Sequence, residues 1–175
     1  GHRLGEWLAA LRLPADGTVT FNGVETSRAR TPGLRETVAF VRRGDLFEGT
    51  VLENVTAGRD LLTAAEARAA LEKVGLLDEL RALPDGIDTH LYDSGAPLDP
   101  GQTVRLLVAR AIAGAPRLVV VDESLEGLDA KSRAQCVAAL TRPQAPWTLV
   151  ALVNDPASAL ARACDTTHTL AEVHA

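Results

Sequence analysis

The sequence has no methionine, only two cysteines and no apolar stretch long enough to cross a bilayer. Its longest apolar runs, residues 118–121 and 147–153, fall far short of the roughly 20 residues that a transmembrane helix needs. Cys136 and Cys164 do not suggest a disulfide framework or a zinc site, so a reducing cytosol is the expected compartment. The first residues do not form a signal peptide.

Basic residues are also in the minority. The 175 residues include 18 Lys and Arg against 23 Asp and Glu, which gives a net charge of −5 and leaves no basic run to neutralise phosphates. This balance argues against a nucleic-acid surface, so no nucleic-acid partner is expected. The length fits one domain with a real core, and residues 1–175 are interpreted as a single partial domain.

Hydrophobic patterning predicts alternating helices and strands. The regular alternation after residue 117, with a fully apolar strand there, indicates an α/β core with a mostly parallel sheet. A helical insert is expected over about residues 51–113. The expected helices cover residues 3–13, 51–57, 63–74, 76–82, 99–113, 129–140 and 156–163, and the expected strands cover 18–22, 37–42, 117–121, 147–153 and 166–170.

The strongest chemical signal lies at residues 117–123, which read Arg-Leu-Val-Val-Val-Asp-Glu. A buried strand that ends in two acids places Asp122 and Glu123 at the carboxyl edge of a sheet, where α/β proteins bind ligands. One acid there can hold Mg²⁺ through water, and the next can orient or deprotonate an attacking water. A buried strand that ends in an exposed acidic turn without function is an equally weighted alternative.

The residues just before this strand extend the pattern. Residues 98–102 read Leu-Asp-Pro-Gly-Gln, and they open a helix that leads straight into the strand. This arrangement resembles the signature motif, helix and Walker B strand of ABC transporter nucleotide-binding domains, where the signature is Leu-Ser-Gly-Gly-Gln. Residues 123–129, Glu-Ser-Leu-Glu-Gly-Leu-Asp, are similar to the D-loop that follows in that family.

Upstream segments point to the exporter branch of the same family. Residues 45–54, Asp-Leu-Phe-Glu-Gly-Thr-Val-Leu-Glu-Asn, resemble the exporter stretch that follows the Q-loop. Residues 83–89 and 93–95 resemble the exporter segment before the signature. The matches run in the right order over about residues 4–170, and they imply a partial P-loop NTPase fold of the ABC ATPase type.

The resemblance implies the following site. ATP and Mg²⁺ are the expected cofactors, with Asp122 as the Walker B aspartate on the metal and Glu123 as the catalytic glutamate. The residues that it implies at the nucleotide are Arg43, Leu98, Asp99, Pro100, Gly101, Gln102 and Asp129. The implied partners are a second nucleotide-binding domain, as a homodimer or heterodimer, and the transmembrane domain of an exporter at the cytoplasmic face of a membrane.

Four departures from the family pattern affect this site. The loop Gly-x-x-x-x-Gly-Lys-Ser/Thr is not among these residues, although it supplies most of the grip on nucleotide phosphates. Arg43 stands in place of the Q-loop glutamine, where a guanidinium would repel a metal. It could instead pair with Asp122 or Glu123, or be a solvated surface residue.

The other two departures lie at helix starts. Asp99 and Pro100 replace the signature serine and first glycine, and Asp followed by Pro is a favourable start for any helix. We favour that structural interpretation. Asn154 replaces the switch histidine and cannot exchange a proton near neutral pH, although it could equally be part of a turn.

Two hypotheses follow. The chain is part of an exporter in which it forms a degenerate site, with weak or no ATPase activity alone. Alternatively, it is a non-enzymatic pseudo-ATPase that serves as a docking or regulatory module. The sequence does not identify a transported substrate.

Overall fold

The core of the protein is a three-stranded parallel sheet. The computed structural model describes residues 2–21, 23–25 and 37–170. In the sheet, β3 (Val38–Val41) pairs with β6 (Leu118–Asp122), which pairs with β7 (Thr148–Leu152), in the order β3-β6-β7. The fully buried centre of β6 consists of Val119, Val120 and Val121, as expected for a strand covered on both faces.

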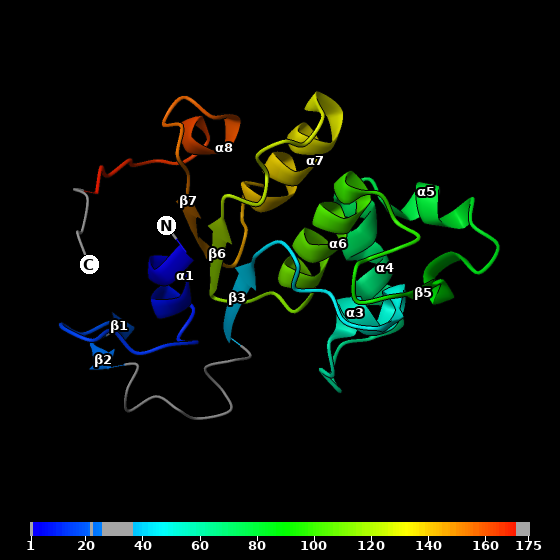
Figure 1. Ribbon diagram of the computed structural model, residues 1–175, viewed down its shortest axis with the longest axis horizontal. Coiled ribbons are helices and arrows are strands. Elements are labelled where there is room, and N and C mark those ends of the chain that lie inside the picture. The colour runs from blue at the N-terminus through cyan, green and yellow to red at the C-terminus, as the bar shows by residue number, and fades with distance from the viewer. Residues whose placement is uncertain (1, 22, 26–36, 171–175) are drawn as a thin grey trace.

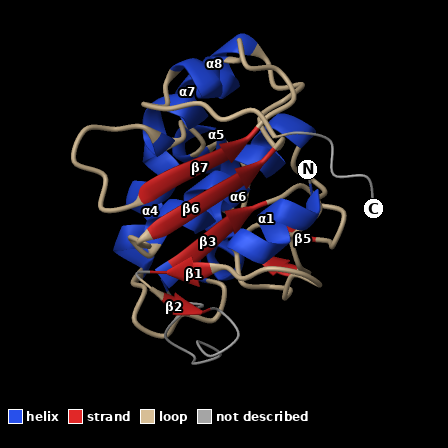
Figure 2. Ribbon diagram, turned by 90° about the vertical axis from the view of Figure 1, so that its left-hand side faces the viewer, coloured by secondary structure: helices blue, strands red, loops and turns tan. Residues whose placement is uncertain are grey.

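Helices cover both faces of this sheet. In Figure 2, α1 (His2–Leu8) lies in front of the strands, and α6 (Pro100–Ala113) lies behind them. Gly5 permits the close approach of α1, because a Cβ there would lie 3.0 Å from the Phe40 ring and 3.2 Å from Leu152 Cδ1. A small antiparallel pair, β1 (Thr20–Phe21) and β2 (Val24–Glu25), follows α1.

The crossover from β3 to β6 contains most of the helices (Figure 1). This segment also contains an antiparallel pair of short strands, β4 (Gly49–Thr50) and β5 (His90–Leu91). Its most extensive helix packing is that of α6 on α3 and α4. The elements of this segment are α3 (Val51–Thr56), α4 (Ala64–Lys73), α5 (Leu77–Arg81), the short 3-10 helix η1 (Gly86–Asp88) and α6. Threonine capping boxes begin α3 at Thr50 and α4 at Thr63.

The second crossover is shorter. Helix α7 (Ala130–Leu140) connects β6 to β7, and α8 (Ala159–Arg162) follows β7. Trp147 is buried before β7, where its Nε1 donates to the carbonyl of Leu140 at 2.9 Å. One continuous apolar cluster joins the helices to the sheet.

The predicted α/β class with a mostly parallel sheet is confirmed. The predicted strand at residues 166–170 is wrong, because this segment is exposed and pairs with no strand among the described residues. The helix predicted over residues 3–13 ends at Leu8, with Ala10 in the left-handed region at φ 55°. The strand predicted at residues 18–22 is reduced to β1, and Asn22 lies outside the described residues.

Two further differences are small. The helix predicted over residues 156–163 begins later, with Ser158 as the N-cap of α8. The antiparallel pair β4–β5 was not predicted, since each of its strands has only two residues. In the part of the chain that is described, no helix combines the length and apolar character required to cross a membrane.

Candidate functional site

Asp122 occupies the carboxyl end of β6. It is 3% exposed, and it lies in register with Leu152 at the end of β7. The carboxyl ends of all three strands meet at this edge because the sheet is parallel. The strand therefore delivers a buried carboxylate to the edge where the sequence placed it.

Glu123 follows with a strained backbone. Its φ is 50°, in the left-handed region that L residues other than glycine, asparagine and aspartate rarely adopt. The Glu123 amide still donates to the carbonyl of Leu152 at 3.0 Å, so β7 holds the residue in this conformation. The turn directs the chain away from the sheet, and Glu123 lines a cavity of about 410 Å³.

The same cavity is lined by Asn154, which follows β7 and is exposed. Arg133 and Ser158 add polar groups, while Leu125 and Leu160 form part of an apolar wall. The structure thus brings Glu123 and Asn154, two of the predicted site residues, to one cavity. The backbone N–H of Asn154 donates to Glu126 Oε1 at 3.4 Å, and this bond connects the turn after β7 to the loop after β6.

Two side chains hold the loop after β6. Ser124 is fully buried, and its Oγ lies 3.0 Å from the carbonyl oxygens of both Val41 and Asp122. Arg43, just past the end of β3, donates through Nε to the carbonyl of Ser124 at 3.2 Å and through a second nitrogen to the carbonyl of Glu126. The loop is therefore fastened to the end of β3 at several points.

These contacts correct one of the alternatives for Arg43. The hydrogen bonds of its guanidinium go to backbone carbonyls of the loop rather than to the carboxylates of Asp122 or Glu123. Arg43 is exposed, as the surface interpretation required, but it is bound rather than free. Arg42 and Arg43 face different surroundings, since Arg42 bonds Asp45 and Glu6 whereas Arg43 bonds the loop after β6.

Among the described residues, Arg42 forms the ion pairs that Arg43 does not. Its guanidinium bonds Asp45 Oδ1 at 2.9 Å and Glu6 Oε1 at 3.2 Å. The hydrogen bond to Asp45 raises the pKa of Arg42 most, and the charges of Asp45, Glu6 and Asp122 raise it further. The sequence did not single out Arg42, because nothing in its local pattern distinguishes it from its neighbour.

The predicted signature segment forms the start of α6. Asp99 is the N-cap, with its Oδ1 accepting from the Gln102 amide at 2.8 Å, and Pro100 occupies the first turn. The side chain of Gln102 completes a capping box by accepting from the Asp99 amide at 3.0 Å. Leu98 is buried just before the cap. The structural interpretation of Asp99 and Pro100 as a helix start is confirmed.

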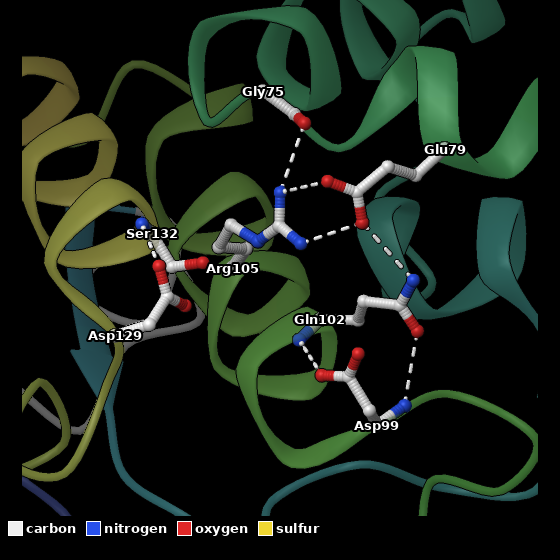
Figure 3. Close-up of polar contacts among 7 residues, drawn as sticks. All are labelled: Gly75, Glu79, Asp99, Gln102, Arg105, Asp129 and Ser132. Atoms are coloured by element: carbon white, nitrogen blue, oxygen red, sulfur yellow. Dashed lines mark hydrogen bonds and ion pairs between the residues drawn. The ribbon is translucent and has the colours of Figure 1, made fainter.

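Figure 3 shows what lies beneath this helix start. Gln102 Nε2 donates to Glu79 Oε2 at 3.0 Å, and the same carboxylate accepts two bonds from Arg105 at 2.8 and 2.7 Å. The hydrogen bond from Arg105 is the main reason why the pKa of Glu79 is lowered. Neither residue was predicted as part of the site, although Arg105, like Arg110, stands among apolar residues of α6 and could have been noticed for that reason.

Asp129 begins α7 and lies close to α6. Its Oδ1 accepts from the Ser132 amide at 3.0 Å, and the hydrogen bonds from Ser132 lower its pKa most. A Cβ on Gly101 would lie 3.2 Å from Asp99 Oδ1 and 3.9 Å from Asp129 Oδ2. The missing side chain of Gly101 thus gives room chiefly to the carboxylate of Asp99, since a Cβ at 3.9 Å from Asp129 would make only an ordinary contact.

The predicted residues therefore form two groups. The first, at the sheet edge, contains Asp122, Glu123 and Asn154. The second, at the start of α6, contains Leu98, Asp99, Pro100, Gly101, Gln102 and Asp129. Loop 123–129, to which Arg43 is bonded, joins the groups, and the amino end of α6 and the carboxyl end of β6 point the same way in Figure 1.

A metal at the first group would need ligands from outside the protein. Among the described residues, no three His, Cys, Asp or Glu side chains lie close enough together to hold an ion. Mg²⁺ is commonly bound by one or two carboxylates together with the phosphates of a substrate, so a single buried aspartate suits it when a nucleotide is bound. The donor set fits Mg²⁺ only in that combination.

Known proteins are similar to this chain in sequence and in fold. An ABC transporter family model matches residues 4–126. The chain is 34% identical over 145 residues to the ABC multidrug transporter MDR2 of Trichophyton tonsurans, covering 81% of this chain and 11% of that protein. It is 38% identical over 130 residues to the ATP-dependent lipid A-core flippase of Burkholderia orbicola, covering 74% of this chain and 22% of that protein.

The fold matches a solved structure of a bacterial Atm1-family ABC exporter with ATP bound, with a TM-score of 0.79 and 23% identity over 88% of this chain and 27% of the other. The chain spans only about a tenth to about a fifth of the length of these curated relatives. The matched segment holds both groups of site residues except Asp129 and Asn154. On the family model and the curated relatives, the chain belongs to the ABC transporter family.

Proposed function

We propose that this chain is part of the nucleotide-binding domain of an exporter, in which ATP binding and hydrolysis are coupled to transport. The observation that supports this most is the placement of Asp122 and Glu123 at the carboxyl edge of β6, with Glu123 and Asn154 lining one cavity. In this proposal residues 1–175 form one partial domain, with a helical insert over about residues 51–113.

The side chains have distinct roles in the proposed site. Bound Mg·ATP would supply the phosphoryl group and the metal that neutralises its charge. Asp122 would hold the metal, because its carboxylate is buried at the sheet edge. Glu123 would orient the attacking water and accept its proton, since its strained backbone aims it away from the sheet and into the cavity.

We expect these residues alone to hydrolyse ATP weakly or not at all. Residues 1–175 do not include a phosphate loop, so the backbone amides and the lysine that hold phosphates in this family are not among them. The amide of Gln102 at the start of α6 is already bonded to the carboxylate of Asp99. Asn154 can hydrogen-bond a phosphate but cannot transfer a proton near neutral pH.

In the exporter proposal the partners are a second nucleotide-binding domain and a transmembrane domain. The similarity to a multidrug transporter and to a lipid A-core flippase supports a membrane-embedded partner. In this proposal the chain lies at the cytoplasmic face of that membrane. The start of α6 would face a nucleotide held by the second domain. The loss of the signature serine and the switch histidine favours a heterodimer in which this half forms the degenerate site.

The alternative is a pseudo-ATPase that acts as a docking or regulatory module. The observation that favours it is the use of the altered positions as structure: Asp99 caps α6, and Arg43 is bonded to loop carbonyls. An antibody raised against this chain can separate the proposals in fractionated source cells. A band much larger than 18.5 kDa in the membranes supports the exporter, whereas a soluble band of this size supports the module.

The cause of weak hydrolysis can be tested on the chain itself. Asp99→Ser with Pro100→Gly restores the family residues at the start of α6. We expect no phosphate release from ATP by this double variant, because the phosphate loop is not among residues 1–175 and these two substitutions do not supply it. Turnover by the double variant would show instead that Asp99 and Pro100 are the block.

A further inference from the structure

We infer that Arg105 is a positioning residue, which fixes the start of α6 against α5 and the turn before it through Glu79 and Gln102. A role of Arg105 in nucleotide binding rests on the proposed function. The physical link itself does not, because every contact that makes it lies within this chain (Figure 3).

Arg105 is buried and needs partners. It is 4% exposed, and a guanidinium removed from water is costly unless its charge and its donors are matched. Its two terminal nitrogens bond the two oxygens of Glu79 at 2.8 and 2.7 Å, and one of them also donates to the carbonyl of Gly75 at 2.9 Å. Such a two-point bond between planar groups fixes orientation as well as distance.

Glu79 passes this constraint to the start of α6. Its Oε2, already bonded to Arg105, accepts a second bond from Gln102 Nε2 at 3.0 Å. Gln102 is three residues before Arg105 and so lies on the same side of the helix. The side-chain carboxamide of Gln102 is thereby held in place, and its Oε1 accepts from the backbone N–H of Asp99 at 3.0 Å. A chain of hydrogen bonds thus runs from Arg105 through Glu79 and Gln102 to the backbone of Asp99.

The charge of Arg105 also reaches both capping carboxylates. The pKa of Arg105 is raised mainly by its hydrogen bond to Glu79, and the charge of Asp99 raises it further. The pKa of Asp129 is lowered mainly by its bonds to Ser132, with a smaller part from Arg105. One buried cation is therefore shared by the carboxylates that begin α6 and α7.

The turn at Gly75 brings α7 into the same assembly. Gly75 has φ +66°, and a Cβ there would lie 2.0 Å from the side-chain nitrogen of Gln135 on α7. The carbonyl of Gly75 accepts from Arg105. The guanidinium thus lies on α6 next to Glu79 of α5 and to the turn that joins α4 to α5, and Gln135 of α7 lies against the same turn. A movement of α5 would be transmitted to the residues proposed to face the nucleotide.

Amide hydrogen exchange measured by NMR on the nucleotide-free chain tests this link. In Glu79→Ala we expect the Asp99 and Gln102 amides to exchange about tenfold faster, the size of a modest local opening. The amides of residues 108–112, at the other end of the same helix, should keep their rates. Glu72→Ala, which removes an exposed carboxylate from α4, is the matched control and should change neither group.

A merely structural role would accelerate exchange equally along α6, and that result would overturn the proposal, as would unchanged exchange at Asp99 and Gln102. If Glu79→Ala does not fold, Glu79→Gln gives the same comparison with the side-chain volume kept. Arg105→Gln should also speed exchange at Asp99 and Gln102. Arg105→Lys should exchange at a rate between that of Arg105→Gln and that of the parent chain, because an ammonium cannot bond both oxygens of Glu79 in a fixed plane. The exchange experiment uses no nucleotide. A negative result would therefore refute the link through Arg105 without refuting the proposed function, and an absence of ATP binding would refute neither the link nor its contacts.

Discussion

Asp99 and Gln102 cap each other at the start of α6. The Gln102 amide donates to Asp99 Oδ1 at 2.8 Å, and the Asp99 amide donates to Gln102 Oε1 at 3.0 Å. The first amides of a helix are natural donors to an anion, and in this chain an internal carboxylate takes one of them. Asp99, which replaces the serine of the family signature, is thus the N-cap of α6.

We predict that Asp99→Ala destabilises the chain by about 1 kcal/mol, the usual cost of losing an N-cap side chain. Urea unfolding followed by circular dichroism measures the change. Asp99→Asn is the matched control, because its side-chain oxygen can still accept from the Gln102 amide, and it should lie within about 0.5 kcal/mol of the parent. Equal stability of the alanine and parent chains would show that the cap contributes nothing.

The strained backbone at Glu123 gives a second prediction. Since φ is 50° there, Glu123→Gly should be more stable than Glu123→Ala by about 1 kcal/mol, the strain that a Cβ adds in this region. Thermal or urea unfolding of the two variants measures it. At Glu72, an exposed position inside α4, the order should reverse, with glycine about 1 kcal/mol less stable than alanine. The same order at both positions would refute the strain.

Arg43 should be a stabilising residue of the loop after β6. Its guanidinium bonds the carbonyls of Ser124 and Glu126, so Arg43→Met is expected to cost about 1 kcal/mol of unfolding free energy. Arg68→Met, an exposed arginine of α4 for which the structure gives no hydrogen bond to the described residues, should cost less than about 0.5 kcal/mol. If both substitutions cost the same, the loop contacts do not stabilise the fold.

Acid should weaken the link between Glu79 and Arg105. The pKa of Glu79 is lowered in the folded chain, chiefly by the hydrogen bond from Arg105. Its contribution to stability is therefore fully present above the unfolded pKa of about 4.3 and is lost as pH falls through the lower folded value. The difference in unfolding free energy between the parent and Glu79→Gln should be constant from pH 7 to about 5 and should shrink below about pH 4. A difference that stays constant down to pH 3 would contradict this assignment.

Local patterns were enough to predict the elements that are long or strongly marked. The apolar run before Asp122 predicted β6, and the hydrophobic pattern over residues 63–74 predicted α4. The Asp-Pro pair at residues 99–100 predicted how α6 begins. Each of these signals depends on neighbours in sequence, which is why it could be read without the fold.

Contacts between distant segments could not be predicted in the same way. Arg43 reaches the loop after β6 across more than 80 residues, and Arg105 meets Glu79 across 26. Residues 166–170 have a strand-like pattern, but they find no partner strand among the described residues, and local preference cannot form a ladder alone. The groups that hold the candidate site in place are of this long-range kind.

Isothermal titration of the chain with Mg·ATP tests the central claim most directly, namely that these residues lack the main grip on nucleotide phosphates. The account predicts no saturable binding up to millimolar ATP, because Asp122, Glu123 and Asn154 offer few donors to a phosphate. Binding with a micromolar Kd, equivalent to about −8 kcal/mol, would contradict it and would place the grip within residues that are already here.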